Sequence, residues 1–355
     1  MARTISISAT RRCVIAQLYS IQLPLSIHSP APITHLPILL LNIHTQCNCR
    51  CVMCDIWQRK DSSELHAASL ERHRDSLISL GVQRVVLSGG EPLLNRDLPA
   101  IIAFFRALGI RITLLSTGLL LHSKAALIAG GVDDVILSID GPPEIHNTIR
   151  RIPRAFETIA RGVETLRTLN PAIPINCRNT IQKQNHTHLR GAVAAAHSLG
   201  LNSISFLPAD VSSSAFNRDQ QQWPTTRQNE IALTASELIA LENEIELLIE
   251  AHQSDLRTRF IAENEAKLRR IPTRFREHLE GTPPQSPRCN APWVSTVMEV
   301  DGTLRPCFFH PPIASTTNAT LEQALNTQLA QAFRSQLHVP TNPTCQRCVC
   351  SLNYR

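Results

Sequence analysis

The chain has 355 residues, of which 43% are hydrophobic and 18% are charged. This length and apolar content predict one large α/β unit with an appendage, or two domains, and they exclude a globally disordered chain. No uninterrupted apolar run approaches the roughly 20 residues of a membrane-spanning helix, so we expect no membrane partner. The formal net charge is +6, but the arginines are scattered and aromatic residues make up only 4%, which argues against a nucleic-acid partner.

Residues 1–36 form an N-terminal extension that contains no Asp or Glu and carries Arg3, Arg11 and Arg12. This composition is typical of an organelle transit peptide or of a twin-arginine signal. No clean apolar stretch follows the arginines, because polar residues such as Gln17 interrupt it. We therefore predict an extension that is flexible or packs on the rest of the chain.

From residue 37 onward, short runs rich in Val, Ile and Leu alternate with segments of helical period. Such runs are typical of parallel strands that are covered by helices. The alternation repeats about six times and predicts a parallel sheet with right-handed crossovers, either open or closed into a barrel. The six predicted strands are Ile38–Ile43, Arg84–Leu87, Ile110–Leu115, Asp134–Ile139, Ile173–Ile181 and Ser203–Leu207.

Helices are predicted between and after these strands. Residues 210–232 are polar and indicate a loop or linker, and Thr234 with Glu237 forms a capping box that opens a helix. Three prolines and a glycine at 281–287 indicate a boundary before a short, turn-rich C-terminal part. Further predicted helices cover Pro153–Leu169, His186–Leu199 and Asp255–Arg270.

Cys47, Cys51 and Cys54 follow the first predicted strand, at the edge where parallel α/β folds place active sites. Eleven clustered cysteines make a poor disulfide framework for a chain of this length and indicate metal or iron–sulfur ligands in a reducing compartment. Three thiolates can hold three irons of a [4Fe–4S] cube, which leaves the fourth iron open to an exogenous ligand. Cys49 lies among them and could instead complete a four-ligand zinc site.

The motif CNCRCVMC, followed by DIW, resembles the cluster motif of radical S-adenosylmethionine (radical SAM) enzymes. Three further motifs follow successive predicted strands in the order found in that family: Gly89-Gly90-Glu91-Pro92, Ser116-Thr117-Gly118 and LSIDGPPEIHNTIR. The resemblance covers residues 37–210. It implies the α/β fold class and, within it, a partial (β/α)6 barrel of TIM type.

The resemblance also implies roles for particular residues. Cys47, Cys51 and Cys54 would ligate the cluster, and S-adenosylmethionine would complete the open iron through its amino and carboxylate groups. Met53 and the Ser116-Thr117-Gly118 triplet depart from the family pattern, which often has an aromatic residue and an Asn at these places. The residues expected to contact S-adenosylmethionine are Gly89, Gly90 and Glu91 at the amino group, Ser116, Ser138 and Asp140 at the ends of the next two strands, Asn179 on the fifth strand, and Ile56 and Trp57 at the adenine.

A second set of cysteines comprises Cys289, Cys307, Cys345 and Cys348. A predicted hairpin with Asp301-Gly302 at its turn lies between the first two. From the spacing alone, four soft ligands fit zinc and an iron–sulfur cluster equally well. Their order resembles the auxiliary-cluster domain called SPASM, and its shortened form called twitch, because Tyr354 stands where the full pattern has another cysteine. The resemblance implies one auxiliary [4Fe–4S] cluster on these four residues, with Cys350 as a rival for the fourth place.

Three other residues have more than one interpretation. His310 is a structural residue or a base for substrate deprotonation, and Cys177 is a core thiol or a hydrogen donor. Arg178 binds a substrate carboxylate or phosphate, or else lies at the surface or beside S-adenosylmethionine.

The predicted protein is a cytoplasmic radical SAM enzyme with two [4Fe–4S] clusters and a flavodoxin- or ferredoxin-type electron donor. It would cleave S-adenosylmethionine reductively to a 5′-deoxyadenosyl radical, abstract a substrate hydrogen, and oxidise or cyclise the substrate with the auxiliary cluster as electron acceptor. The predicted domains are the extension 1–36, the radical SAM barrel 37–210, a helical linker 211–288 and the auxiliary-cluster domain 289–355.

A small metabolite is the favoured substrate, because residues 1–36 are too few for a fused leader-binding domain of the kind found in peptide-modifying relatives. The alternative is a maturase of a ribosomal peptide. An alternative of another class is a zinc-stabilised binding protein without catalysis.

Overall fold

The computed structural model describes residues 32–218, 223–282, 284 and 286–354, so nearly all of the predicted extension 1–36 lies outside the described residues. A nine-stranded sheet forms its centre, in the order β6-β5-β4-β3-β2-β1-β7-β8-β9. All six strands predicted from the sequence are confirmed, with ends that agree within two residues. The strands are β1 Ile38–His44, β2 Arg84–Gly89, β3 Arg111–Ser116, β4 Asp134–Ser138, β5 Ile175–Ile181, β6 Ser203–Pro208, β7 Ser295–Met298, β8 Thr303–Arg305 and β9 Ala314–Ser315.

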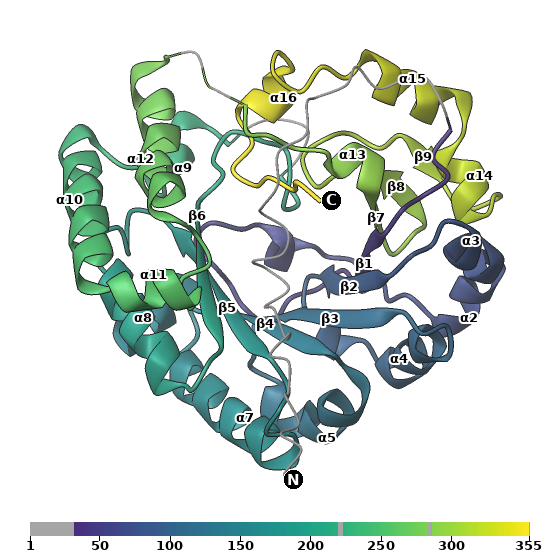
Figure 1. Cartoon of the computed structure of the whole chain (residues 1–355), viewed down its shortest axis with the longest axis horizontal. Coiled ribbons are helices and arrows are strands. Elements are labelled where there is room, and N and C mark those ends of the chain that lie inside the picture. Colours follow the sequence, from purple (N-terminus) through teal and green to yellow (C-terminus); the bar gives the residue numbers. More distant parts are fainter. Residues whose placement is uncertain (1–31, 219–222, 283, 285, 355) are drawn as a thin grey trace, which may run out of the picture.

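Strands β1 to β6 are parallel to their neighbours, and helices surround them on the outside (Figure 1). The sheet has two ends, β6 and β9, so it is a partial barrel, as the family resemblance implied. The helices, with 3₁₀ turns marked η, are η1 Ile56–Gln58, α2 Ala67–Leu70, η2 Glu71–His73, α3 Arg74–Ser79, η3 Pro92–Leu94, α4 Leu98–Ala107, α5 Leu121–Gly131, α6 Pro143–Arg150, α7 Ala155–Leu169, α8 Leu189–Ser198, α9 Thr225–Asn229, α10 Ala235–Ala251, α11 Gln253–Thr258, α12 Glu265–Glu280, α13 Ala291–Val294, α14 Leu321–Leu325, α15 Gln328–Gln336 and α16 Pro343–Gln346.

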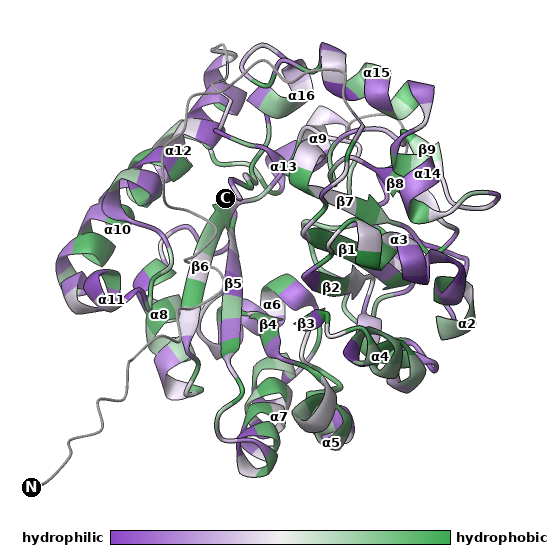
Figure 2. Ribbon diagram, turned by 45° about the vertical axis from the view of Figure 1, so that its right-hand side comes forward, coloured by the Kyte–Doolittle hydropathy of each residue, from purple (hydrophilic) through white to green (hydrophobic). Residues whose placement is uncertain are grey.

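The two faces of the barrel strands have different roles. Leu39 and Leu41 of β1 are at most 1% exposed and pack in the core between strands and helices, whereas Leu40 and Asn42 line a cavity on the concave face. This alternation follows from the two-residue period of a strand. Apolar residues dominate β1 and β7, while α10 and α12 carry both kinds along their length (Figure 2). The concave face is therefore free to carry the chemistry of a site.

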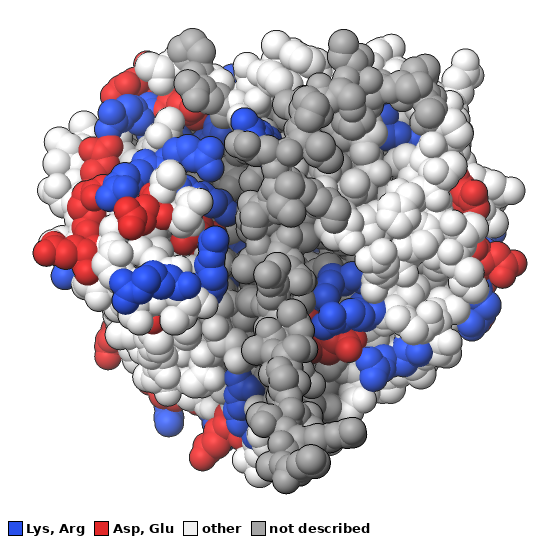
Figure 3. Space-filling model, in the orientation of Figure 1, with Lys and Arg blue, Asp and Glu red and all other residues white. Residues whose placement is uncertain are grey.

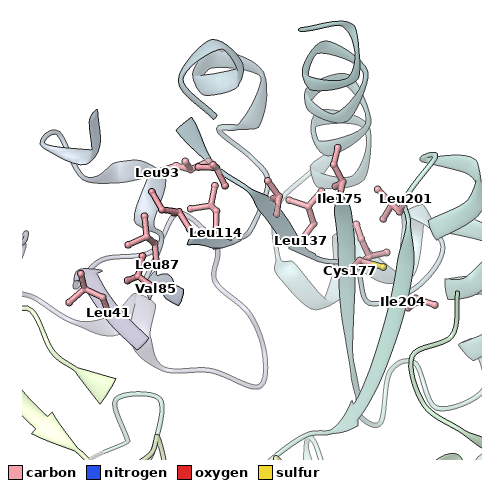
Figure 4. Packing of buried hydrophobic residues seen from close by; sticks show 14 of the residues in the cluster. Leu41, Val85, Leu87, Leu93, Leu114, Leu137, Ile175, Cys177, Leu201 and Ile204 are labelled. Atoms are coloured by element: carbon pink, nitrogen blue, oxygen red, sulfur yellow. The ribbon is translucent and has the colours of Figure 1, made fainter. Parts of the chain in front are cut away.

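The core is one continuous layer from β1 to β6, and Cys177 of β5 lies within it, close to Ile175 and Leu137 (Figure 4). Burial raises the pKa of the Cys177 thiol. The side chain is fully buried among apolar neighbours, which favours the interpretation of a core thiol over that of a hydrogen donor.

The predicted helix Asp255–Arg270 is wrong, because two helices occupy this stretch. Helix α11 ends at Thr258, and Arg259 adopts a left-handed conformation with φ 64°. Residues 260–262 then pair with the edge of β6, where the N–H of Ile204 donates to Phe260 O at 2.7 Å. Covering an unpaired strand edge satisfies backbone groups that a continuous helix would leave open. Helix α12 restarts after the cap Asn264.

The capping box predicted for Thr234 and Glu237 is confirmed at the start of α10. Helix α10 packs on α12, and surface ion pairs join them, among them Arg269 with Glu246 at 2.8 Å. Basic and acidic side chains are interspersed over this face (Figure 3). Exposed pairs of this kind contribute about 0–1 kcal/mol each, so the buried stripe along α10, which includes Leu241, does more to hold the helices together.

The C-terminal segment extends the sheet of the barrel. Strand β7 pairs in parallel with β1, from Ile38 opposite Ser295 to Leu41 opposite Met298. The predicted hairpin is confirmed, since β7 and β8 are antiparallel and Gly302 at their turn has φ 81°. The hairpin places the second set of cysteines beside the open side of the barrel.

Candidate metal centres

The loop that carries Cys47, Cys51 and Cys54 leaves the C-terminal end of β1 and runs to η1. Cys51 is buried and the other two are partly buried. The backbone N–H groups on either side of Cys51 donate to the carbonyls of Ile149 and Arg150, each at 3.1 Å. The end of α6 therefore fixes the position of the cysteine loop.

A buried arginine provides positive charge beside the central cysteine of this loop. Arg150 Nη1 lies 3.4 Å from Cys51 Sγ, and Arg150 Nε donates to Asp140 Oδ2 at 2.6 Å. The Cys49 thiol hydrogen-bonds to Cys51 and lowers the pKa of Cys51 to about 6 against the effect of burial, and the charge of Arg150 acts in the same direction. Burial raises the pKa values of Cys47 and Cys54 to about 12. The environment thus favours a thiolate at Cys51 and gives Cys49 a contact that its position in the sequence did not suggest.

The end of β2 packs directly against this loop through glycines. A Cβ atom on Gly90 would lie 2.0 Å from Gln46 O, a distance that no side chain can occupy. The N–H of Gly90 donates to His44 O at 2.7 Å, and the N–H of Glu91 donates to Gln46 O at 2.8 Å. Glycine is therefore required at position 90 for the two backbones to approach each other.

The Glu91 carboxylate is fully buried and bonds to the end of β3. It accepts hydrogen bonds from Ser116 Oγ at 2.8 Å, from the N–H of Thr117 at 2.7 Å and from the N–H of Leu93 at 3.0 Å. Burial raises the pKa of Glu91. Two of the residues expected at S-adenosylmethionine, Glu91 and Ser116, are thus bonded to each other and join the ends of β2 and β3.

Strand β5 shows which of its residues face the cavity. Arg178 and Thr180 line the cavity, whereas Asn179 is fully buried and its Oδ1 accepts from Asn185 Nδ2 at 3.3 Å. Ser138 of β4 stands opposite Arg178 in the register. The alternation along the strand therefore brings Arg178, and not Asn179, to the cavity wall.

The two residues expected at the adenine lie on η1, directly after the cysteine loop. Ile56 lines the large cavity. Trp57 Nε1 donates to Cys54 O at 2.8 Å, and its ring lines a second cavity of about 490 Å³ together with Cys47. Both residues are therefore adjacent to the cysteine loop.

A segment beyond β6, which we call the clasp (residues 210–218 and 223–232), also forms hydrogen bonds with the cysteine loop. Arg218 is buried, pairs with Asp210 at 2.7 Å, and donates through Nη2 to Met53 O at 3.3 Å. Its guanidinium lies 3.8 Å from the centroid of the Trp223 ring, and Trp223 Nε1 donates to Asp55 Oδ2. Arg227 also donates to a carbonyl of the loop.

The sequence alone did not point to Arg150, Arg218, Trp223 or Arg227. Arg150 does lie in the motif LSIDGPPEIHNTIR, ten residues after Asp140, and a short helix predicted between the two residues could have suggested the contact. The clasp had no such signal, because its polar composition is typical of any surface linker. Only the tertiary fold brings it to the cysteine loop.

The second set of cysteines also comes together. Burial raises the pKa values of Cys289, Cys307 and Cys348, and the nearby Cys350 contributes to each of these three shifts, so the four thiols lie close together. The C-terminal tail closes on this group, since the N–H of Asn290 donates to Leu352 O at 2.8 Å. The tail thereby places Cys350 beside Cys289.

Cys345 lies at the margin of this group and contacts His310, whose Nε2 is 3.2 Å from Cys345 Sγ. Burial raises the pKa of Cys345 to about 12 and lowers the pKa of His310. The ring of His310 also packs edge-on against Phe333. These contacts favour a structural His310 over a base for the substrate.

One cavity of about 2120 Å³ runs from residues that flank the three-cysteine loop to the second set of cysteines, and Cys47, Cys51 and Cys54 themselves do not line it. Gly89, Gly90 and Ile56 line it at the first site, and Cys307 and Cys348 line it at the second. Every cysteine of the described residues is a free thiol. The described residues contain no group of three or more His, Cys, Asp or Glu placed to hold one metal ion. A [4Fe–4S] cube does not need such a group, because each thiolate binds a different iron.

The fold and the site define the class of this protein: a partial (β/α)6 barrel with a three-cysteine loop after its first strand and a cysteine-rich C-terminal part. A family model of the radical SAM superfamily matches residues 41–177, and a model of the SPASM iron–sulfur cluster-binding domain matches residues 289–349. The chain thus carries a radical SAM domain and a SPASM iron–sulfur domain.

Curated relatives match the barrel. The chain is 32% identical over 154 residues to Fe-coproporphyrin III synthase of Methanosarcina barkeri, which covers 42% of this chain and 38% of the relative. It is 30% identical over 128 residues to a probable GTP 3′,8-cyclase of Methanococcus maripaludis, covering 35% of this chain and 43% of the relative. The chain thus spans less than half the length of each of these relatives.

Solved structures share the fold over most of the chain. The structure of native anSMEcpe with bound AdoMet superposes with a TM-score of 0.63 at 16% identity and covers 89% of this chain and 93% of that one. A radical SAM domain implies a [4Fe–4S] cluster with S-adenosylmethionine, and a SPASM domain implies auxiliary iron–sulfur binding. No helix of the described residues is long and apolar enough to cross a membrane.

The residues present fit these cofactors. Cys51 already receives a hydrogen bond from a buried cation, which compensates the charge of a thiolate ligand. Gly89 ends β2 and Gly90 follows it, and neither residue has a side chain that would cover the backbone. This stretch of backbone therefore lines the large cavity beside the cysteine loop. Partly buried cysteines of the C-terminal set, among them Cys307 and Cys348, also line this cavity.

Proposed function

We propose that this enzyme cleaves S-adenosylmethionine reductively and oxidises or cyclises a small metabolite with the help of an auxiliary cluster. When bound, the first cluster supplies an electron that splits S-adenosylmethionine, and the resulting 5′-deoxyadenosyl radical removes a hydrogen atom from the substrate. The chain's own residues position the reactants and exclude water from the site. The observation that carries the proposal is the cavity that runs from Gly89, Gly90 and Ile56, beside the three-cysteine loop, to Cys307 and Cys348.

Cys47, Cys51 and Cys54 are the proposed ligands of the first cluster. Arg150 positions Cys51, and Asp140 holds Arg150, so we assign Asp140 a positioning role in addition to the expected contact with S-adenosylmethionine. The backbone at Gly89 and Gly90 is the proposed contact for the amino group, because it lines the cavity without side chains. Glu91 and Ser116 support this backbone through their mutual hydrogen bond.

Ser138, Ile56 and Trp57 remain proposed contacts of S-adenosylmethionine. Ile56 lines the cavity and Trp57 is tied to Cys54, which suits them to the adenine side of the site. Asn179 is a weaker candidate, since its amide group lies away from the cavity wall.

Cys289, Cys307, Cys345 and Cys348 are the proposed ligands of one auxiliary [4Fe–4S] cluster. The proximity of Cys350 to Cys289 and Cys348 keeps it as the rival ligand. Removal of a hydrogen atom leaves the substrate with an unpaired electron, which must be lost, together with a proton, for an oxidised closed-shell product. The C-terminal set offers five cysteines, enough to ligate all four irons of one cube. No iron is then left open to bind the substrate, so we assign the auxiliary cluster the role of electron acceptor.

The curated relatives support a small-molecule substrate, because the names of those given above refer to a coproporphyrin and to GTP. The solved structures with bound peptides resemble this chain at 14–18% identity and bear on the fold alone. We further propose that a flavodoxin- or ferredoxin-type protein supplies the electron, as in the superfamily.

The test is the formation of 5′-deoxyadenosine from S-adenosylmethionine by the reconstituted chain with dithionite under anaerobic conditions. We expect product from the wild type and none from a variant with Cys47, Cys51 and Cys54 replaced by Ala. A colourless chain that carries zinc and yields no 5′-deoxyadenosine would support the zinc-stabilised binding protein instead.

A further inference from the structure

A second pocket lies beside the cysteine loop. Its volume is about 490 Å³, and Cys47, one of the three proposed ligands of the first cluster, lines it. Among the described residues, none lines both this pocket and the large cavity. An electron for the first cluster therefore has an approach by way of Cys47 that does not cross the space proposed for the substrate.

The surroundings of this pocket are positively charged. Arg50 of the cysteine loop and Arg151 at the end of α6 line it, and Arg154 lies three residues beyond Arg151. All three residues are exposed, and within the described ranges none of them forms an ion pair. No Asp or Glu of the described residues lines the pocket, since Glu144 of α6 and Glu157 of α7 both stand outside it.

Hydrogen bonds fix the loop that carries Arg151 and Arg154. The N–H of Ile152 donates to Asn147 O at 3.3 Å, and the N–H of Phe156 donates to Asn147 Oδ1 at 2.9 Å. Arg151 and Arg154 adopt left-handed backbone conformations, with φ 53° and 56°. A residue with a side chain keeps such a conformation only where the surrounding structure fixes it, so the two arginines belong to a preformed surface.

The chemistry of this surface indicates the partner. Three arginines around an opening attract an acidic protein, and electrostatic attraction speeds the encounter of oppositely charged proteins. Ile152 and Pro153 add apolar contact area in the pocket. A flavodoxin combines an acidic surface with the exposed apolar edge of a flavin, which a concave pocket can receive, whereas a ferredoxin covers its cluster with polypeptide.

Trp57 also lines the pocket, but it is a proposed contact of S-adenosylmethionine and is not assigned to this surface. Gly89 and Gly90, the proposed contacts of the amino group, line the large cavity instead. The amino-acid part of S-adenosylmethionine is therefore assigned to the large cavity, and the arginines are left for another molecule.

We propose that Arg50, Arg151 and Arg154 form a docking surface for an acidic flavodoxin, which reduces the first cluster by way of Cys47. This inference rests on the proposed function, since it assumes that Cys47 binds a cluster that must be reduced. The anionic flavin hydroquinone loses one electron and becomes the neutral semiquinone, and the oxidised cluster gains that electron. No proton and no covalent bond is transferred.

The experiment uses the reconstituted full chain and an acidic flavodoxin under anaerobic conditions. Calorimetric titration with oxidised flavodoxin gives the dissociation constant, and stopped flow with flavodoxin hydroquinone gives the rate at which the cluster absorbance near 400 nm bleaches. The test variant combines Arg50→Gln, Arg151→Gln and Arg154→Gln. The control variant makes the same change of net charge at three exposed positions on α7, α11 and α12. These changes are Arg161→Gln, Arg257→Gln and Arg270→Gln.

We expect the test variant to raise the dissociation constant of flavodoxin about 10-fold, because it removes three attractive charges. Reduction at subsaturating flavodoxin should slow in proportion, and the control variant should match the wild type. The difference between the test variant and the wild type should shrink as the ionic strength rises, because salt screens exposed charges. Dithionite, which needs no docking surface, should reduce all three proteins at the same rate.

The proposal is overturned if the wild type does not bind flavodoxin, if the test variant binds it as tightly as the wild type, or if the control variant weakens binding equally. It is also overturned if the test variant reacts more slowly with dithionite or binds S-adenosylmethionine more weakly. The arginines would then serve the cluster or the cofactor and not a docking partner.

Failure of this inference can be told from failure of the proposed function. If 5′-deoxyadenosine forms with dithionite but flavodoxin does not bind, the docking surface is wrong and the radical chemistry stands. If flavodoxin binds through the three arginines but neither reductant yields 5′-deoxyadenosine, the proposed function is wrong.

Discussion

Arg150 Nη1 lies 3.4 Å from Cys51 Sγ, although 99 residues separate the two along the chain. Both side chains are buried, and Asp140 holds the other edge of the guanidinium at 2.6 Å. The cysteine loop after β1 is therefore tied to β4 and α6 through one cation. This connection gives the first test of the site.

Arg150→Met should lower the free energy of unfolding by about 3–5 kcal/mol, because it leaves the Asp140 carboxylate buried without its partner. Chemical denaturation measures this loss. The double variant Asp140→Asn with Arg150→Met should recover part of it, since no unpaired charge remains. A single variant as stable as the wild type would contradict the assigned role of the pair.

Gly90→Ala should prevent the cysteine loop from packing on β2, because the added Cβ would lie 2.0 Å from a backbone oxygen. We expect a chain that loses most of its ability to retain the first cluster, measured as iron per chain after reconstitution. Gly130→Ala is the matched control, since nothing lies within 4 Å of its Cβ position in α5. Helix propensity makes that control neutral or stabilising by up to about 1 kcal/mol.

Arg218→Gln should release the clasp from the cysteine loop, because it removes the ion pair with Asp210 and the cation–π contact with Trp223. Limited proteolysis should then cut within residues 210–232 several times faster than in the wild type. Loss of cluster absorbance in the presence of a chelator should accelerate in parallel. Arg106→Gln, at an exposed ion pair with Asp133, serves as the control and should change neither rate.

His146 should make stability depend on pH. Burial lowers the pKa of His146 to about 4, and its Nδ1 accepts a hydrogen bond from the N–H of Asp140 at 3.2 Å. The unfolded chain binds a proton below pH 6.5 that the folded chain excludes down to about pH 4, so stability falls as pH falls through this window. The loss is about 1.4 kcal/mol per pH unit and about 3 kcal/mol at most.

This prediction is checked by denaturation between pH 4.5 and 7 in the wild type and in His146→Gln. The variant should have a shallower dependence over the window. Equal slopes in the two proteins would show that the ring titrates freely in the folded state.

Replacing Cys345 and Cys348 together by Ala should lower the iron content from about eight to about four per chain, since each cube holds four irons. Cys350→Ala should leave about eight, because Cys350 is the rival ligand only. If instead the Cys350 variant loses four irons and the double variant retains them, the assignment of the auxiliary ligands is reversed. Iron analysis and the visible spectrum near 400 nm report both.

The sequence by itself determined the barrel strands, the capping box at Thr234 and the two sets of cysteines. Periodicity, turn residues and ligand spacing are local, so they can be read from neighbouring residues. The split between α11 and α12 was missed, because the pairing of residues 260–262 with β6 is a contact between distant segments. Local propensity does not contain such a contact.

Only the tertiary structure decided which side chains meet at the site. Arg150 reaches Cys51, the clasp reaches Met53, and β7 joins β1, each across a long stretch of chain. The fold also decided that Arg178 and not Asn179 faces the cavity, because the twist and pairing of β5 set which face of the strand turns inward. Such choices depend on packing free energies summed over many residues, and no short motif in the sequence contains them.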